Sequence, residues 1–328
     1  MGQTKGLSSR VLTDCGIVVA LSVVLVLISF YIPVLGTLAT MIWAVPVMAL
    51  VLRRGIFPAI LSVLVSAVVS ILFAGVVGGI LSAAWIGFFG LIYGVCFRKK
   101  ISPLSTLAAG TIAAGIIMVI TLAIGAILGV FSFDGLTATL RESVQQTLSM
   151  YESAGILDQL LPQGMTAAEY GDEILSIMMT LLPAVFILYG MASAALNYLF
   201  AALILKRLNF DITPLPPFRE WHFPWWIMWA IVVALVAYLM GTQWDGGYYH
   251  QIALNIIYLY LPIFLVSGVS MVAWTLYTCR AKTATKVMVW LAVILLIRFS
   301  LPLLLILGAL DPLLDYRKIW NRNPNKKS

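Results

Sequence analysis

The stretch from Ile17 to Ile28 reads IVVALSVVLVLI and carries no charge. Similar apolar runs recur along the chain of 328 residues, of which 62% are hydrophobic and 10% charged. An average soluble domain has about 25% charged residues, and the mean hydropathy here is +1.03. The composition excludes a soluble globular protein, a disordered chain and a secreted module held by disulfides. Because strands of outer-membrane barrels alternate apolar and polar residues, the long runs predict an all-α, polytopic helical membrane protein.

Candidate spans can be counted from the apolar runs, since a membrane-spanning helix needs about 20 apolar residues. The candidates are 13–32, 36–52, 56–75, 79–97, 104–131, 173–205, 223–241, 251–278 and 286–310. The first six form an N-terminal unit, residues 1–207, with an outer acidic loop at 132–172. A polar, proline-rich linker at 208–222 follows. A two- or three-span unit at 223–310 and a basic tail at 311–328 complete the predicted organisation.

The charges predict the topology of these spans. Basic residues gather at span ends, as they do in cytoplasmic loops; the clusters are Arg53–Arg54, Arg98–Lys100, Lys206–Arg207 and Arg280–Lys286. Seven of the thirteen acidic residues lie between Asp134 and Glu173, where Arg141 is the only base. A cytoplasmic N-terminus and eight spans place every basic cluster inside and the acidic loop outside. The net charge of +7 therefore indicates membrane topology and not a nucleic-acid partner.

The ninth candidate span, 286–310, does not fit this pattern, because a crossing would place the basic tail outside. Arg298 and Pro302 lie at its middle, where a helix can break. Either the segment folds back without crossing, or the charge rule fails here. Its 25 residues are enough to span a membrane, which favours a crossing and a total of nine helices.

The outer loop itself has a helical pattern. Apolar residues recur at helical spacing at Leu136, Leu140, Val144, Leu148 and Tyr151. This spacing predicts an amphipathic helix on the outer surface or over the mouth of a cavity. Downstream, Thr166 and Glu169 form a capping-box pattern that would start the next helix.

Three polar residues inside spans are candidates for ligand binding. A charge at mid-membrane costs roughly 2.5–3.5 kcal/mol on insertion scales, so Arg298 needs a role. It would pair with carbonyl groups freed near Pro302, bind an anionic ligand or extend its side chain to the membrane interface. Asn197 and Asn255 would either hold helices together or line a polar cavity.

Pairs of small residues four apart let helix backbones approach closely. Three such pairs are present: Gly16 and Ala20, Gly90 and Gly94, and Gly125 and Gly129. They either pack helices within one subunit or, at Gly16 and Ala20 on the first span, dock a partner helix.

Signatures of common catalytic and metal sites are absent from the sequence. The chain has no GxxxxGK[ST] phosphate loop and no HExxH motif, and its three cysteines lie far apart. We therefore expect no cofactor, no metal site and no enzyme activity. A tryptophan cluster at the start of the seventh span predicts interfacial anchoring; its members are Trp221, Trp225, Trp226 and Trp229.

The chain resembles the YybS-like family of uncharacterised bacterial membrane proteins over nearly its whole length. The matching features are Pro183 and Asn197 in the sixth span, Phe218–Pro224, Asn255, and the closing Leu307–Asp311 with Asp315–Lys318. None of these features is a catalytic signature. The resemblance implies a multi-pass protein of the bacterial cytoplasmic membrane.

The first six spans are also similar to the substrate-capturing S component of energy-coupling-factor (ECF) vitamin transporters. In that family a small-xxx-small motif on the first of six helices docks the coupling subunit, and Gly16 and Ala20 match it in type and place. The resemblance implies a coupling subunit and ATPases as partners. The long loop 132–172 and the extra spans within 223–310 depart from the family.

These features together predict transport-related capture of a small solute from the outer side, with the acidic loop as a lid and a separate ATPase. The alternative is a structural or regulatory membrane scaffold that transports nothing, because few buried residues could hold a hydrophilic ligand. A wet, outward-facing pocket would favour capture. A dry, packed bundle would favour the scaffold.

Overall fold

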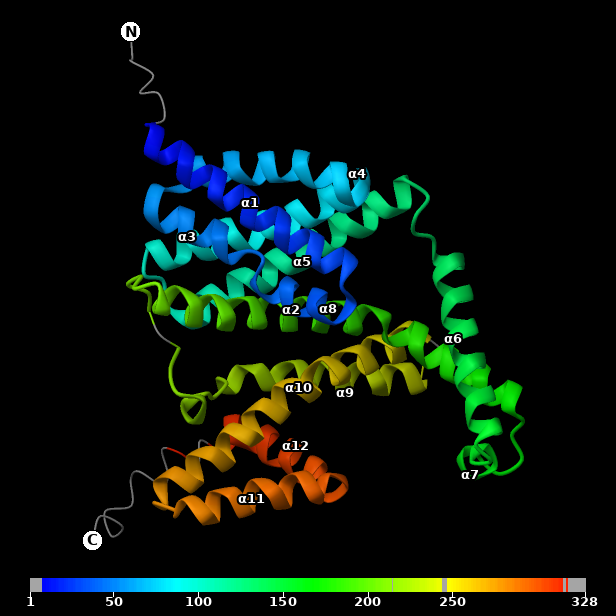
Figure 1. Cartoon of the computed structure of the whole chain (residues 1–328). Coiled ribbons are helices and arrows are strands. Elements are labelled where there is room, and N and C mark those ends of the chain that lie inside the picture. The colour runs from blue at the N-terminus through cyan, green and yellow to red at the C-terminus, as the bar shows by residue number, and fades with distance from the viewer. Residues whose placement is uncertain (1–7, 214, 244–246, 315–316, 318–328) are drawn as a thin grey trace. The chain divides into compact units, whose positions relative to one another are not determined.

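A computed structural model describes residues 8–213, 215–243, 247–314 and 317. Every regular element in these ranges is a helix (Figure 1), which confirms the predicted all-α class. Eight of the described helices are long and apolar enough to cross a membrane. The chain forms two compact units, which do not follow chain order: unit 1 comprises 1–136 and 186–215, and unit 2 comprises 137–185 and 216–328.

Unit 1 is a bundle of apolar helices. Its elements are α1 (Ser9–Tyr31), α2 (Pro33–Ile42), α3 (Val45–Arg54), α4 (Ile56–Arg98), α5 (Pro103–Ile127) and the second half of α8 (Ala167–Arg207). Within α4, Gly75 leaves the helical conformation at φ 72° and ψ 170°. The two halves then run back along each other, since Gly87 of the second half packs against Val63 of the first. They correspond to the predicted spans 56–75 and 79–97.

The centre of unit 1 is filled by aromatic side chains. Phe89, Tyr93 and Tyr198 are each no more than 1% exposed, and the Tyr93 hydroxyl donates a hydrogen bond to the carbonyl of Ala194 at 2.8 Å. The Tyr93 ring lies so close to Gly110 that no side chain could be added there. The middle of this bundle is therefore packed.

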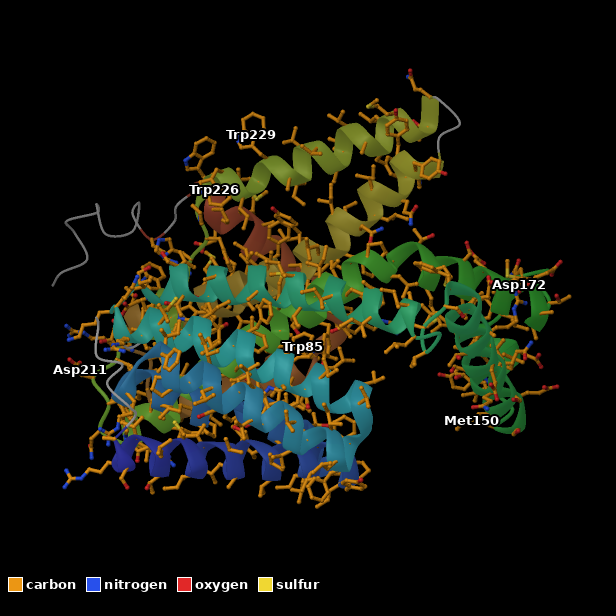
Figure 2. All side chains as sticks on the ribbon, turned by 90° about the horizontal axis from the view of Figure 1, so that it is seen from above. Trp85, Met150, Asp172, Asp211, Trp226 and Trp229 are labelled. Atoms are coloured by element: carbon orange, nitrogen blue, oxygen red, sulfur yellow. The ribbon has the colours of Figure 1, made fainter. Side chains whose placement is uncertain are left out.

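Unit 2 begins with the predicted amphipathic helix. Its elements are α6 (Phe133–Ser153), α7 (Leu157–Leu160), the first half of α8, η1 (Phe218–Glu220), η2 (Trp225–Met228), α9 (Trp229–Gln243), α10 (Gly247–Thr278), α11 (Thr283–Leu295) and α12 (Ile297–Leu314). Met150 and Asp172 mark the α6–α8 segment in Figure 2. Val144 and Leu148 of α6 pack with Leu157 into a small apolar core, so the expected loop is a folded helical segment.

Two smaller predictions within unit 2 can be compared with the structure. The capping box is confirmed, because the carboxylate of Glu169 accepts a hydrogen bond from the Thr166 backbone N–H at 2.8 Å. At the start of α9, Trp226 and Trp229 are each 60% exposed and project away from the ribbon in Figure 2. Interfacial anchoring requires tryptophan side chains that are exposed in this way.

The segment 286–310 is not the one continuous helix that its length favoured, but two helices that fold back on each other. The helix breaks at Leu296 (φ −101°, ψ 34°) between α11 and α12, and the Ser300 hydroxyl donates to the Val293 carbonyl left free at the break. Lys286 near the start of α11 lines a pocket with Arg219, and Arg317 beyond α12 donates to the carbonyl of Arg219. Both ends of this helical hairpin therefore lie against the same short segment.

Candidate functional site

Arg298 lies two residues after the break at Leu296. Its side chain is exposed, and it makes no hydrogen bond or ion pair with the described residues. Asp311, near the end of the same helical hairpin, pairs with Arg317 and not with Arg298. The binding of an anionic ligand by Arg298 stays a prediction.

Asn255 of α10 repairs a gap in helix α8. Its Oδ1 accepts a hydrogen bond from the N–H of Ala184 at 2.8 Å, and its Nδ2 donates to the carbonyl of Thr180 at 2.7 Å. In a continuous helix those two backbone groups would bond to each other. Pro183 lies between them and disturbs the helix. The side-chain amide therefore takes the place of the missing bond, so Asn255 holds two helices of unit 2 together.

Replacing Asn255 with leucine is expected to destabilise unit 2 by about 1–2 kcal/mol, the range for polar contacts between membrane helices. The N–H of Ala184 and the carbonyl of Thr180 would lose their partners where no water can replace them. Thermal unfolding of the purified protein in detergent measures the loss. In a Pro183→Ala background the helix can close its own bond, so the same replacement should cost less. An equal cost in both backgrounds would contradict the repair role.

Asn197 occupies a different setting in unit 1. Its Nδ2 donates to the carbonyls of Thr40 at 3.3 Å and Ser193 at 3.0 Å, and the residue is 2% exposed. Its Oδ1 has no hydrogen-bond partner among the described residues, and neither has the indole N–H of Trp43, one turn beyond Thr40. A buried acceptor and a buried donor near the break between α2 and α3 could bond a small polar molecule.

The three predicted pairs of small residues have different surroundings. Gly90 and Gly94 pack against Val47 and Val51 of α3, so they serve contact within the chain. Gly129 has a φ of 67° just after α5 and serves the turn. In contrast, a Cβ added at Gly16 would meet nothing within 4 Å. Ala20 is likewise exposed. The small face of α1 is open.

A buried ion pair in unit 2 was not predicted from the sequence. The Arg317 guanidinium lies 3.1 Å from the Asp311 carboxylate, and the two side chains are 11% and 3% exposed. Arg317 also donates to the carbonyls of Arg219 and Trp221 at 2.8 and 2.9 Å. Ser267 of α10 donates to the carboxylate at 3.3 Å. This centre therefore ties α12, α10 and the 219–221 segment together.

The sequence does contain a feature that points to this centre. Both Asp311 and Arg317 lie in the closing motif on which the family resemblance rests, whereas Asp315 and Lys318 of that motif lie outside the described residues. A cavity of about 220 Å³ adjoins the ion pair. His222, Phe223 and Trp225 contribute to its lining. The centre is suited to a structural role, in which it holds the Arg317 guanidinium in place. Almost every polar group there is already hydrogen-bonded.

Comparison with known proteins agrees with this architecture. The family model described as "Predicted membrane protein (DUF2232)" matches residues 20–312. The chain is 25% identical over 308 residues to the uncharacterised protein YybS of Bacillus subtilis (strain 168), covering 92% of this chain and 96% of that protein. No solved structure matches. The YybS-like resemblance is confirmed, and the resemblance to ECF S components stays a prediction.

Proposed function

We propose that this protein, which belongs to the DUF2232 family of predicted membrane proteins, captures a small solute as one subunit of a multi-component transporter. A separate coupling subunit would dock on α1, and separate ATPases would supply the energy. The observation that carries the proposal is the open face of α1 at Gly16 and Ala20. The predicted bacterial cytoplasmic membrane, with the N-terminus on the cytoplasmic side, belongs to the same proposal.

The open face supports docking because of what small residues contribute in a membrane. Lipid tails are as apolar as leucine, so a helix gains nothing from lipid by carrying glycine or alanine. Small residues matter where another helix approaches closely. Gly90 and Gly94 have such a helix within the chain, whereas Gly16 has none among the described residues. A helix from another protein is the partner that this face fits.

The polar groups of Asn197 and Trp43 support a ligand in unit 1. A buried donor or acceptor without a partner costs about 1–3 kcal/mol, and a polar solute bonded to both would remove that cost. The acidic loop 132–172, which contains α6 and α7, would act as the predicted lid. Its own pocket of about 410 Å³ lies between α6 and α8 and includes Tyr151 and Tyr170.

A structural or regulatory scaffold is the second candidate function. The packed aromatic centre formed by Phe89, Tyr93 and Tyr198 favours it, because a dry bundle leaves little room for a hydrophilic ligand. A scaffold would use the same open face of α1 for a different partner. The identity of the docked protein therefore separates the two functions.

Gly16→Leu is expected to reduce co-purification of a coupling subunit about ten-fold, equivalent to ~1.4 kcal/mol of binding free energy. The larger side chain would hold the partner helix away from the α1 backbone. The measurement is purification from native membranes in mild detergent, with mass spectrometry of the co-purifying proteins and small molecules. Gly115→Leu is the matched control, since Gly115 of α5 is equally open but lies on another helix.

The outcomes separate the two candidates. Recovery of a coupling subunit and ATPases with the wild-type chain, lost with Gly16→Leu and kept with Gly115→Leu, supports solute capture. Recovery of the protein alone, or with cell-envelope or signalling proteins and no small molecule, would favour the scaffold and reject transport.

A further inference from the structure

An apolar groove in unit 1 ends at an unpaired cation, and we propose that it binds one anionic phospholipid. The groove, here called the α1–α3 groove, has a volume of about 330 Å³. It is lined by α1, α3 and the ends of α2 and α8, and the lining residues used below are Asp14, Leu21, Leu25, Ala49 and Arg53. The phosphate would lie at Arg53, and an acyl chain would lie along the groove.

The length of the groove matches one leaflet of a membrane. Its lining follows α1 from Asp14 to Leu25, eleven steps of 1.5 Å, or about 16 Å. The hydrocarbon core of a bilayer is about 30 Å thick, so one leaflet is roughly 15 Å deep. The groove therefore reaches from the basic end of unit 1 to about the middle of a membrane. Leu21 is 49% exposed, so the groove opens at the surface, where lipid can enter.

The charges at the mouth of the groove select an anion. Asp14 and Arg53 are the only charged residues that line it. Asp14 is already neutralised, because Arg54 donates to its carboxylate at 2.7 Å. Arg53 makes no hydrogen bond or ion pair with the described residues, and its guanidinium lies over the Phe210 ring at 5.2 Å. The Arg53 guanidinium is thus a cation without a counter-ion among the described residues, at the point where the apolar lining ends.

The residues around the mouth of the groove also carry a net positive charge. Eight described basic residues lie on the helix ends or turns around this mouth: Arg10, Arg53, Arg54, Arg98, Lys99, Lys100, Lys206 and Arg207. Only two described acids lie among them, and each is in an ion pair, Asp14 with Arg54 and Asp211 with Lys100. Figure 2 shows Asp211 at this end of the unit 1 helices. Such basic pockets between membrane helices suit phospholipid headgroups.

A phospholipid fits this combination better than the other occupants. A soluble phosphate would leave the apolar lining from Leu21 to Leu25 unused. A helix of a partner protein would use that lining but would leave Arg53 without an anion. A phosphodiester accepts hydrogen bonds from a guanidinium, and its attached acyl chain fills the groove. The inference does not depend on the proposed transport function, since it needs neither solute nor partner subunit.

Native mass spectrometry of the full-length protein released from detergent tests the proposal. Phosphatidylglycerol and phosphatidylcholine with identical chains are the probes. The wild-type protein should retain phosphatidylglycerol at least five-fold better. Arg53→Gln should remove this preference, since one cation near an anionic headgroup contributes about 1 kcal/mol, or roughly five-fold. Ala49→Trp, which fills the groove, should abolish retention of both lipids.

Two control variants and one competitor make the test specific. Arg280→Gln removes the same charge from a residue that does not line the groove, and Leu203→Trp introduces the same tryptophan on α8 at a position that is 60% exposed; both should retain phosphatidylglycerol as the wild type does. Excess glycerophosphate, which has no acyl chain, should not displace the lipid. Unchanged retention in Ala49→Trp, equal effects of Arg53→Gln and Arg280→Gln, or displacement by glycerophosphate would each overturn the proposal.

Discussion

Replacing Asp311 with alanine is expected to lower the free energy of unfolding of unit 2 by about 3–5 kcal/mol, the cost of leaving one member of a buried ion pair without its partner. The Arg317 side chain is only 11% exposed and is held in place by the carbonyls of Arg219 and Trp221. It could not reach water without breaking those bonds. The Ser267 hydroxyl would lose its acceptor as well.

Thermal unfolding of the purified protein in detergent measures this effect. Asp172→Ala is the control, because the Arg141–Asp172 pair has a similar distance of 2.8 Å but side chains that are 53% and 65% exposed. An exposed pair contributes only about 0–1 kcal/mol. Changing Asp311 and Arg317 together to leucine should recover much of the loss, since apolar replacement of a whole buried pair is often neutral. Equal losses for Asp311→Ala and Asp172→Ala would contradict the role of burial.

Gly308→Leu is expected to destabilise unit 2 by about 3 kcal/mol, at the upper end of the cost of overpacking. Any Cβ at Gly308 would collide with the Phe264 carbonyl oxygen and lie 2.8 Å from the Gly268 nitrogen. These are backbone atoms of α10, which cannot move aside as a flexible side chain can. A Cβ at Gly268 would collide in the same way with the Leu304 carbonyl of α12. The two helices cross with their backbones in contact.

The same unfolding measurement tests this prediction, with Gly115→Leu as control. Gly115 also lies inside an apolar helix, but a Cβ there meets nothing within 4 Å, so its replacement should change stability by less than about 1 kcal/mol. Gly308→Ala should show an intermediate loss, because one methyl group already meets the α10 backbone. A similar stability of Gly308→Leu and Gly115→Leu would show that α10 and α12 do not cross this closely.

Much of the helical architecture could be predicted from the sequence, because a lipid environment leaves few choices. A backbone without water must satisfy its own hydrogen bonds, so each long apolar run becomes a helix. The amphipathic helix α6 was predicted from the spacing of its apolar residues, and the capping box at Thr166 follows a local rule. These signals lie within a few neighbouring residues.

The fold-back of 286–310 could not be settled in the same way. The hydropathy and length of this segment fit a single crossing helix and a hairpin that breaks at Leu296 equally well, so neither property decides between them. The buried centre depends on that hairpin, since Arg317 meets Arg219 and Trp221 only when α12 returns. Arg298 was a predicted ligand-binding residue because it is the charge in mid-segment, but its exposed side chain makes no hydrogen bond or ion pair with the described residues. The buried pair of Asp311 and Arg317 lies at the segment's edge instead.

The bond supplied by Asn255 also bears on the order in which the protein is made. Synthesis proceeds from the N-terminal end, so α8 enters the membrane before α10 exists. Until then the N–H of Ala184 and the carbonyl of Thr180 lack the amide that later joins them. The first half of α8 therefore reaches its final form only when α10 is inserted beside it. One asparagine thus couples the maturation of an earlier helix to the arrival of a later one.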